Sequence, residues 1–146
     1  MKITKTMLTG GVKQTGAVMH RLVEDYFLDM TPFISEPVTE VFRLIANIPF
    51  LADPEGHELV QRPKFTFQFG GDCDDKAVAM AAYLKLRGIP YRFRAVGVKR
   101  PYKRIIPLTH VWVEGRIGDS WVVLDCTYSH NVYGQQTVEY QRCELI

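Results

Sequence analysis

The chain contains 146 residues, of which 47% are hydrophobic and 23% are charged, and its formal net charge is +2. This is the composition of one globular domain with its own core, and it excludes a disordered or low-complexity protein. The small net charge gives no indication of nucleic-acid binding. Because no apolar run approaches the roughly 20 residues of a membrane span, no membrane partner is expected either.

The first half of the chain predicts two helices and a loop. An arm over residues 1–11 precedes an apolar stripe at helical spacing within residues 19–30. A second stripe lies within residues 38–45, with Ser35 as its expected N-cap. Residues 52–72 are rich in Pro, Gly and Asp, so they are expected to form mainly a loop.

A third helix follows, and one of its faces is lined by small and apolar residues, namely Ala77, Met80, Ala81 and Leu84. Asp72 is the expected N-cap, and Gly88 is the expected stop at the other end. Cys73 is therefore predicted to lie in the first turn of this helix.

After the third helix the hydrophobic period changes to two. Alternation over residues 91–96 and 108–113, and a nearly continuous apolar run over residues 121–125, predict three strands. Helices followed by antiparallel strands are typical of an α+β protein. We expect a single domain over residues 1–146, in which residues 129–146 form a C-terminal extension.

The three cysteines, at positions 73, 126 and 143, provide neither a disulfide framework nor a C-x-x-C zinc pair. Cys126 is interpreted as a core residue and Cys143 as a tail thiol. The residues at the N-terminus do not form a secretory signal, because Gly10 and Gly11 interrupt any apolar stretch. We therefore expect a reducing, cytoplasmic compartment.

Cys73 has the sequence context of a nucleophile. The free N–H groups at a helix N-terminus favour a thiolate and can also hold an oxyanion, and the preceding Gly70-Gly71 permits close approach of the backbone. A pKa below that of a free thiol is therefore expected, although the neighbouring acids oppose it. Those acids, Asp72, Asp74 and Asp75, are interpreted as caps of the helix, and neither a metal nor a cofactor is expected.

The base and its partner are predicted from the strands. His110 is the one histidine inside a strand run, and Asp125 ends the third apolar run, where an acid is otherwise out of place. A turn centred between Ile117 and Gly118 would make His110 and Asp125 direct cross-strand neighbours, with Cβ atoms about 5 Å apart. A shift of one residue would put them on opposite faces.

Three blocks of this sequence resemble the transglutaminase-like cysteine superfamily: Gly71-Asp72-Cys73-Asp74-Asp75-Lys76-Ala77, Thr109-His110-Val111-Trp112-Val113-Glu114 and Trp121-Val122-Val123-Leu124-Asp125. The resemblance covers about residues 35–128. It implies a papain-like fold, with the nucleophile at a helix N-terminus packed against an antiparallel sheet. It also implies that Cys73 is the nucleophile, His110 the general base and Asp125 the residue that orients the base.

Members of this superfamily attack amide carbons with a thiolate. The resemblance thus implies a thiol-dependent amide hydrolase or acyltransferase that acts on a protein or peptide. Gln68, as an oxyanion donor, Trp112 and His130 are the candidate substrate-binding residues. The alternative is a structural or binding module that retains the fold, assembled into a larger complex. Since stand-alone domains of this type resemble proteins of bacteria and their phages, that complex would be a virion tail or baseplate.

The near-neutral total hides an uneven distribution of charge. Residues 87–104 contain seven basic residues and no acid, whereas residues 24–75 contain eleven acids and three bases. The basic segment is either a solvated hairpin tip or a docking patch for an acidic protein partner. Because few aromatic residues accompany the basic ones, nucleic acid is not expected as a ligand.

Overall fold

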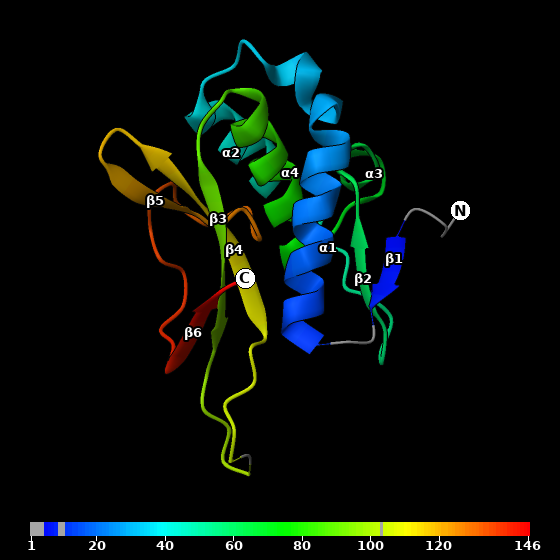
Figure 1. Ribbon diagram of the computed structural model, residues 1–146, viewed down its shortest axis with the longest axis vertical. Helices are drawn as coiled ribbons and strands as arrows, with labels where there is room; N and C mark the ends of the chain where they lie inside the picture. The colour runs from blue at the N-terminus through cyan, green and yellow to red at the C-terminus, as the bar shows by residue number, and fades with distance from the viewer. Residues whose placement is uncertain (1–4, 9–10, 103) are drawn as a thin grey trace.

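The computed structural model describes residues 5–8, 11–102 and 104–146 (Figure 1). Its elements follow the chain in the order β1 (Lys5–Leu8), α1 (Gly11–Tyr26), η1 (Phe27–Phe33), α2 (Val38–Ala46), β2 (Glu58–Gln61), α3 (Pro63–Phe69), α4 (Cys73–Leu86), β3 (Tyr91–Gly97), β4 (His110–Ile117), β5 (Ser120–Leu124) and β6 (Arg142–Leu145). The mixture of helices and antiparallel strands confirms the predicted α+β class. Within the described ranges, no helix combines the length and the apolar character that crossing a bilayer requires.

Helix α4 is the centre of the fold. It contacts α1, α2, α3, η1 and β4, and all of its residues from 74 to 84 are buried. Its start is fixed by a capping box, in which the Asp72 side chain accepts from the N3 backbone and the Asp75 side chain accepts from the Asp72 backbone. Gly88, with a φ of 70°, follows its last turn. These boundaries agree with the prediction and place Cys73 at the first helical position.

The main sheet has the strand order β5-β4-β3-β6, and all of its pairs are antiparallel. Its inner face, which includes Phe93, Val111 and Val113, belongs to the core cluster around α4. Its outer face carries polar and aromatic groups, among them Trp112 and Glu114. In Figure 1 the helices lie to one side of this sheet, and the small β1–β2 sheet lies beyond them.

The register between β4 and β5 differs from the one expected from the sequence. The two strands are joined by a two-residue turn at Gly118-Asp119, in which Gly118 has a φ of 64°, and Ile117 is opposite Ser120. The ladder thus runs two residues away from the predicted register. Because side chains alternate with a period of two, this shift leaves His110 and Asp125 on the same face.

Several predicted boundaries in the first half need correction. The residue at the N-cap of α2 is Pro37, not Ser35. The first apolar stripe is split between α1 and η1, although its residues Met19 and Met30 are buried as expected. Helix α3 was not predicted, because its three phenylalanines, Phe65, Phe67 and Phe69, alternate with a period of two and give no helical pattern.

Both ends of the chain take part in sheets. In the predicted arm, β1 pairs with β2, while residues 1–4 and 9–10 lie outside the described residues. In the C-terminal extension, β6 pairs with β3, so Cys143 belongs to a strand. The segment before β6 covers part of the outer face of the sheet, where the Tyr140 and Trp112 rings lie 6.1 Å apart.

Candidate active site

Cys73 is half-buried where the chain enters α4, whereas Cys126 is buried and Cys143 is exposed. The entry is tight. A Cβ at Gly70, whose φ is 91°, would lie 2.7 Å from the carbonyl oxygen of Pro49, and one at Gly71 would lie 2.7 Å from Cβ of Asp75. The two glycines therefore permit the close approach that was predicted for them, and this approach fixes the backbone just before the thiol.

The expected low pKa of the Cys73 thiol is wrong. Burial raises the pKa well above the ordinary value, and the charges of Asp74, Asp72 and Asp125 raise it further. A hydrogen bond from the backbone of Val111 acts in the opposite direction but does not compensate. Cys73 is thus a protonated thiol at neutral pH, so it would need a base to remove its proton before it could act as a nucleophile.

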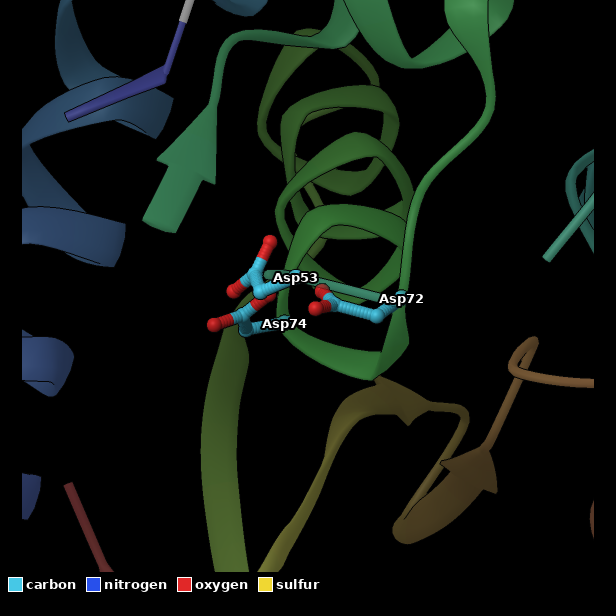
Figure 2. Close-up of side chains that lie close together, drawn as sticks. All are labelled: Asp53, Asp72 and Asp74. Carbon is cyan, nitrogen blue, oxygen red and sulfur yellow. The ribbon is translucent and has the colours of Figure 1, made fainter. Parts of the chain in front are cut away.

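Figure 2 shows the acids beside the first turn of α4, where the carboxylates of Asp53, Asp72 and Asp74 gather. One oxygen of each lies within 4.8 Å of the others. Two of the three have structural roles, since Asp72 caps α4 and Asp53 accepts from the backbone N–H of Leu59 at 2.8 Å. The charges of Asp72 and Asp74 also raise the pKa of the Cys73 thiol.

His110 is the first residue of β4, and its Nε2 lies 2.7 Å from Oδ2 of Asp125. Because a carboxylate accepts a proton in a hydrogen bond, neutral His110 carries its proton on Nε2. Its Nδ1 then keeps a lone pair and is the nitrogen that can act as a base. The structure therefore brings these two predicted residues together, by a diagonal rather than a direct cross-strand contact.

Asp125 is 1% exposed, and both of its carboxylate oxygens are saturated with donors. Oδ1 accepts from the backbone N–H and the hydroxyl of Thr127, at 3.1 and 2.6 Å, and Oδ2 accepts from His110 and from the hydroxyl of Thr137. Burial by itself raises the pKa of Asp125. The hydrogen bonds from His110 and the two threonines, together with the electrostatic effect of the imidazole, outweigh burial, so the pKa of Asp125 lies below its usual value.

Cys73 and His110 line the same pocket, which has a volume of about 450 Å³. One wall is the start of α1, and the other is formed by the chain around the start of β4. The remaining lining residues are Gly11, Val12, Thr15, Asp74, Ala95, Leu108, Thr109, Val111 and Ile146. A thiol, an imidazole oriented by a buried carboxylate and a pocket that both side chains line are the parts that thiol catalysis on an acyl group would require.

The three residues predicted to bind substrate are not part of this pocket. Trp112 is 1% exposed, and its indole nitrogen donates to Glu114 at 3.0 Å. It is too deeply buried to touch a substrate, so its predicted role is corrected: its ring lies 5.9 Å from that of His110, against which it packs. Gln68 is exposed on α3, and His130 is exposed and stacked on Tyr128.

Sequence reasoning missed Thr127, Thr137 and Val111. Thr127 had a readable signal, because a threonine two residues after an aspartate commonly donates back to that carboxylate. Thr137 lies twelve residues from Asp125, in a segment without a periodic pattern. The backbone of Val111 acts through the approach of β4 to α4, which only the tertiary structure shows.

Comparison with known proteins gives three results. The profile of the transglutaminase-like superfamily matches residues 28–126. No curated protein matches the chain in sequence. Two solved structures resemble it: a candidate cysteine protease from Cytophaga hutchinsonii and the periplasmic domain of TgpA from Pseudomonas aeruginosa bound to ethylmercury.

The Cytophaga protein is 12% identical with a TM-score of 0.48, and the alignment covers 95% of this chain and 53% of that one. The TgpA domain is 20% identical with a TM-score of 0.45, and the alignment covers 85% of this chain and 47% of that one. The present chain thus spans about half the length of the two structures.

The range that matches the family profile includes Cys73, His110 and Asp125. Because this match covers residues 28–126, the chain belongs to the transglutaminase-like superfamily.

Proposed function

We propose that this protein is a cysteine enzyme that cleaves or transfers amide acyl groups of a protein or peptide, with Cys73 as nucleophile. The observation that carries this proposal is the hydrogen bond of 2.7 Å between His110 Nε2 and the buried Asp125 carboxylate, next to a pocket that Cys73 also lines. Holding the proton of the imidazole on Nε2 leaves Nδ1 free to receive the thiol proton.

The reaction divides into two acyl transfers. Nδ1 of His110 takes the proton of the Cys73 thiol while the sulfur attacks the amide carbon, and the imidazolium is stabilised by Asp125. His110 then gives this proton to the leaving nitrogen, the C–N bond breaks, and a thioester on Cys73 remains. In the second half, His110 deprotonates a water or an amine that attacks the thioester, and the proton returns to the departing sulfur.

The proposal is tested by intact-protein mass spectrometry after incubation with a chloroacetyl-capped peptide amide. We expect one adduct in the wild type, none in Cys73→Ala, and slowed labelling in His110→Gln. Cys126→Ser and Cys143→Ser are the matched controls and should label at the wild-type rate. Labelling that is slow in the wild type and equal at the exposed Cys143 would contradict the enzyme and favour a binding or structural module.

We also propose that the substrate or its protein carrier has an acidic segment, which docks on the connection between β3 and β4. This connection extends beyond the rest of the molecule (Figure 1). It exposes three basic residues, Lys99, Arg100 and Arg104, together with Tyr102, which is 99% exposed. Lys103 lies outside the described residues. The same connection ends at Leu108 and Thr109 in the wall of the pocket, so a bound acidic segment would be held close to Cys73.

A further inference from the structure

We propose that Lys76 is a positioning residue of this active site, whose buried ammonium ties the loop after Asp125 to the helix that begins with Cys73. The catalytic part of this inference rests on the proposed function. The hydrogen bonds of Lys76, in contrast, do not depend on the proposed reaction. Lys76 lies one turn after Cys73 on α4, and it is 1% exposed.

The ammonium of Lys76 donates to three backbone carbonyls. Nζ lies 2.6 Å from the oxygen of Ile48, 2.8 Å from that of Thr127 and 3.4 Å from that of Ala46. Three acceptors match the three N–H bonds of a charged ammonium, whereas a neutral amine has only two. Burial lowers the pKa of Lys76, and the charge of the nearby Asp125, which acts in the opposite direction, does not cancel this effect. The three acceptors, in contrast, favour the charged form, because each N–H bond of the ammonium has a partner.

The Thr127 carbonyl is the contact that matters for the site. The same residue donates twice to Oδ1 of Asp125, from its backbone N–H and from its hydroxyl. Lys76 therefore holds the segment that in turn holds the acid. The acid orients His110, and the backbone of Val111, the next residue on β4, contacts the Cys73 thiol.

These contacts form a closed ring that passes from Cys73 along α4 to Lys76, across to Thr127 and Asp125, and back through His110 and β4. Within this ring, the Lys76 ammonium joins the loop after Asp125 to the helix that begins with Cys73. If the Lys76 ammonium is removed, α4 and β4 keep their own hydrogen bonds, but Asp125 can move away from Cys73. A displacement of about 1 Å in such a site costs roughly 100-fold in rate.

The second carbonyl extends the same role to the entry of α4. Ile48 precedes the segment that runs beside the residues just before the nucleophile: the backbone N–H of Gly71 donates to Pro49 at 3.2 Å, and that of Leu51 donates to Gly71 at 3.0 Å. Lys76 thus holds two segments near the start of α4: the segment that begins at Ile48 and the loop that contains Thr127.

The test compares Lys76→Met, which keeps the side-chain length without donors, with Lys76→Arg and the wild type. Lys85→Met is the matched control, because Lys85 is on the same helix and forms an ion pair near the surface with Glu24. For the chloroacetyl peptide we expect Lys76→Met to lower the maximal labelling rate about 100-fold, with a half-saturating concentration within twofold of the wild type. Lys76→Arg should recover part of the rate, and Lys85→Met should equal the wild type.

A spectroscopic readout separates positioning from stability. The Nε2 proton of His110, which Asp125 holds in a hydrogen bond of 2.7 Å, should give a downfield proton resonance in the wild type. We expect this resonance to be lost or shifted in folded Lys76→Met but kept in Lys85→Met. If folded Lys76→Met retains both the resonance and the wild-type maximal rate, Lys76 has only a structural role and the proposal is wrong.

Should the variants fail to fold, hydrogen exchange of the wild type decides. The proposal expects the Thr127 amide to open together with the first turn of α4, as one unit. Exchange at Thr127 far faster than at the amide of Lys76 would overturn it. Neither the resonance nor the exchange depends on activity. A wild type that the peptide does not label would therefore contradict the proposed function, and these two measurements would still decide the role of Lys76.

Discussion

His110 and Asp125 meet diagonally across the sheet, with Nε2 and Oδ2 2.7 Å apart, although the β4–β5 ladder puts Asp125 beyond the end of β5 and nearer to Trp112 than to His110. The contact is made because Asp125 lies just after the end of β5, where the hydrogen bonds of Thr127 hold the carboxylate beside the first residue of β4. Asp125 is therefore positioned by the loop after β5 as well as by the ladder. We expect the geometry of the site to depend most on this loop.

Asp125→Asn is expected to lower the acylation rate by about three orders of magnitude. The two donors of Thr127 would keep the amide oxygen on their side, so the amide NH₂ would face Nε2 of His110. Nε2 would then have to accept, the ring proton would move to Nδ1, and the base would be lost. The measurement is the maximal labelling rate of Cys73 by the peptide probe.

Thr137→Val is the control for this prediction. It removes one hydroxyl donor to Asp125 but keeps the carboxylate, so the loss should be less than tenfold. An Asp125→Asn variant that labels at more than a tenth of the wild-type rate would contradict the tautomer argument.

The sequence predicted the parts of the site better than their arrangement. Cys73 at a helix start follows from the local capping pattern of Asp72 and Asp75, which acts within one turn. The prediction that His110 and Asp125 share a face follows from the period of two of a strand. A register error of two residues leaves this prediction correct. The register itself depends on which residues occupy the turn. Gly118-Asp119 places a glycine at the first position of a two-residue turn, where φ is positive, whereas Ile117-Gly118 would place a β-branched residue there. Turn chemistry therefore favours the observed register, and the prediction did not use it.

The electrostatics of the thiol could not be read from the sequence. A helix N-terminus lowers a thiol pKa only when its N–H groups dominate, whereas here burial and the acids outweigh them. The role of Lys76 was equally hidden, because a lysine in a helix usually faces solvent. Its burial results from three carbonyls that converge from α2, the chain after it and the loop after β5.

The raised pKa of Cys73 predicts a distinct pH profile. In the protein without substrate, the rate of alkylation of Cys73 by iodoacetamide should still be rising at pH 9, because the pKa of the thiol is raised above its ordinary value of 9.0. Asp74→Asn removes a charge that raises this pKa, so its profile should shift to lower pH and its labelling at pH 7.5 should be faster. Asp119→Asn, at the exposed turn between β4 and β5, should leave the profile unchanged. A plateau of the wild-type rate below pH 8 would be inconsistent with a thiol whose pKa is raised above its ordinary value.

Charge reversal of the β3–β4 connection tests the docking proposal separately from the chemistry. The triple variant Lys99→Glu, Arg100→Glu, Arg104→Glu is expected to reduce the labelling efficiency of a chloroacetyl peptide with an acidic tail about tenfold. The neutral peptide should label at the wild-type rate, since these exposed side chains lie outside the pocket. Added salt should weaken the preference of the wild type for the acidic peptide. Equal efficiency of the two peptides in the wild type at low salt would refute the docking site.

Glu114 supplies a stability prediction on the outer face of the sheet. It is 4% exposed and accepts from Arg92 at 2.8 Å, Arg94 at 2.7 Å and the indole of Trp112 at 3.0 Å. Burial raises the pKa of Glu114, but these hydrogen bonds and the charge of Arg94 outweigh it, so the pKa is lowered. A lowered pKa means that the carboxylate stabilises the fold above its ordinary pKa of 4.5 and that this stabilisation is lost as the pH falls through the folded value.

Glu114→Gln should therefore reduce the free energy of unfolding by about 2 kcal/mol at pH 7, because two partly buried guanidinium groups lose their counter-charge. The difference from the wild type should shrink as the pH falls below 4.5, where the carboxyl of the wild type is itself being protonated. Urea denaturation at both pH values measures it, and Glu139→Gln, at an exposed position, is the control. A difference that stays constant between pH 7 and pH 3 would show that the lost stability comes from packing rather than from the charge of Glu114.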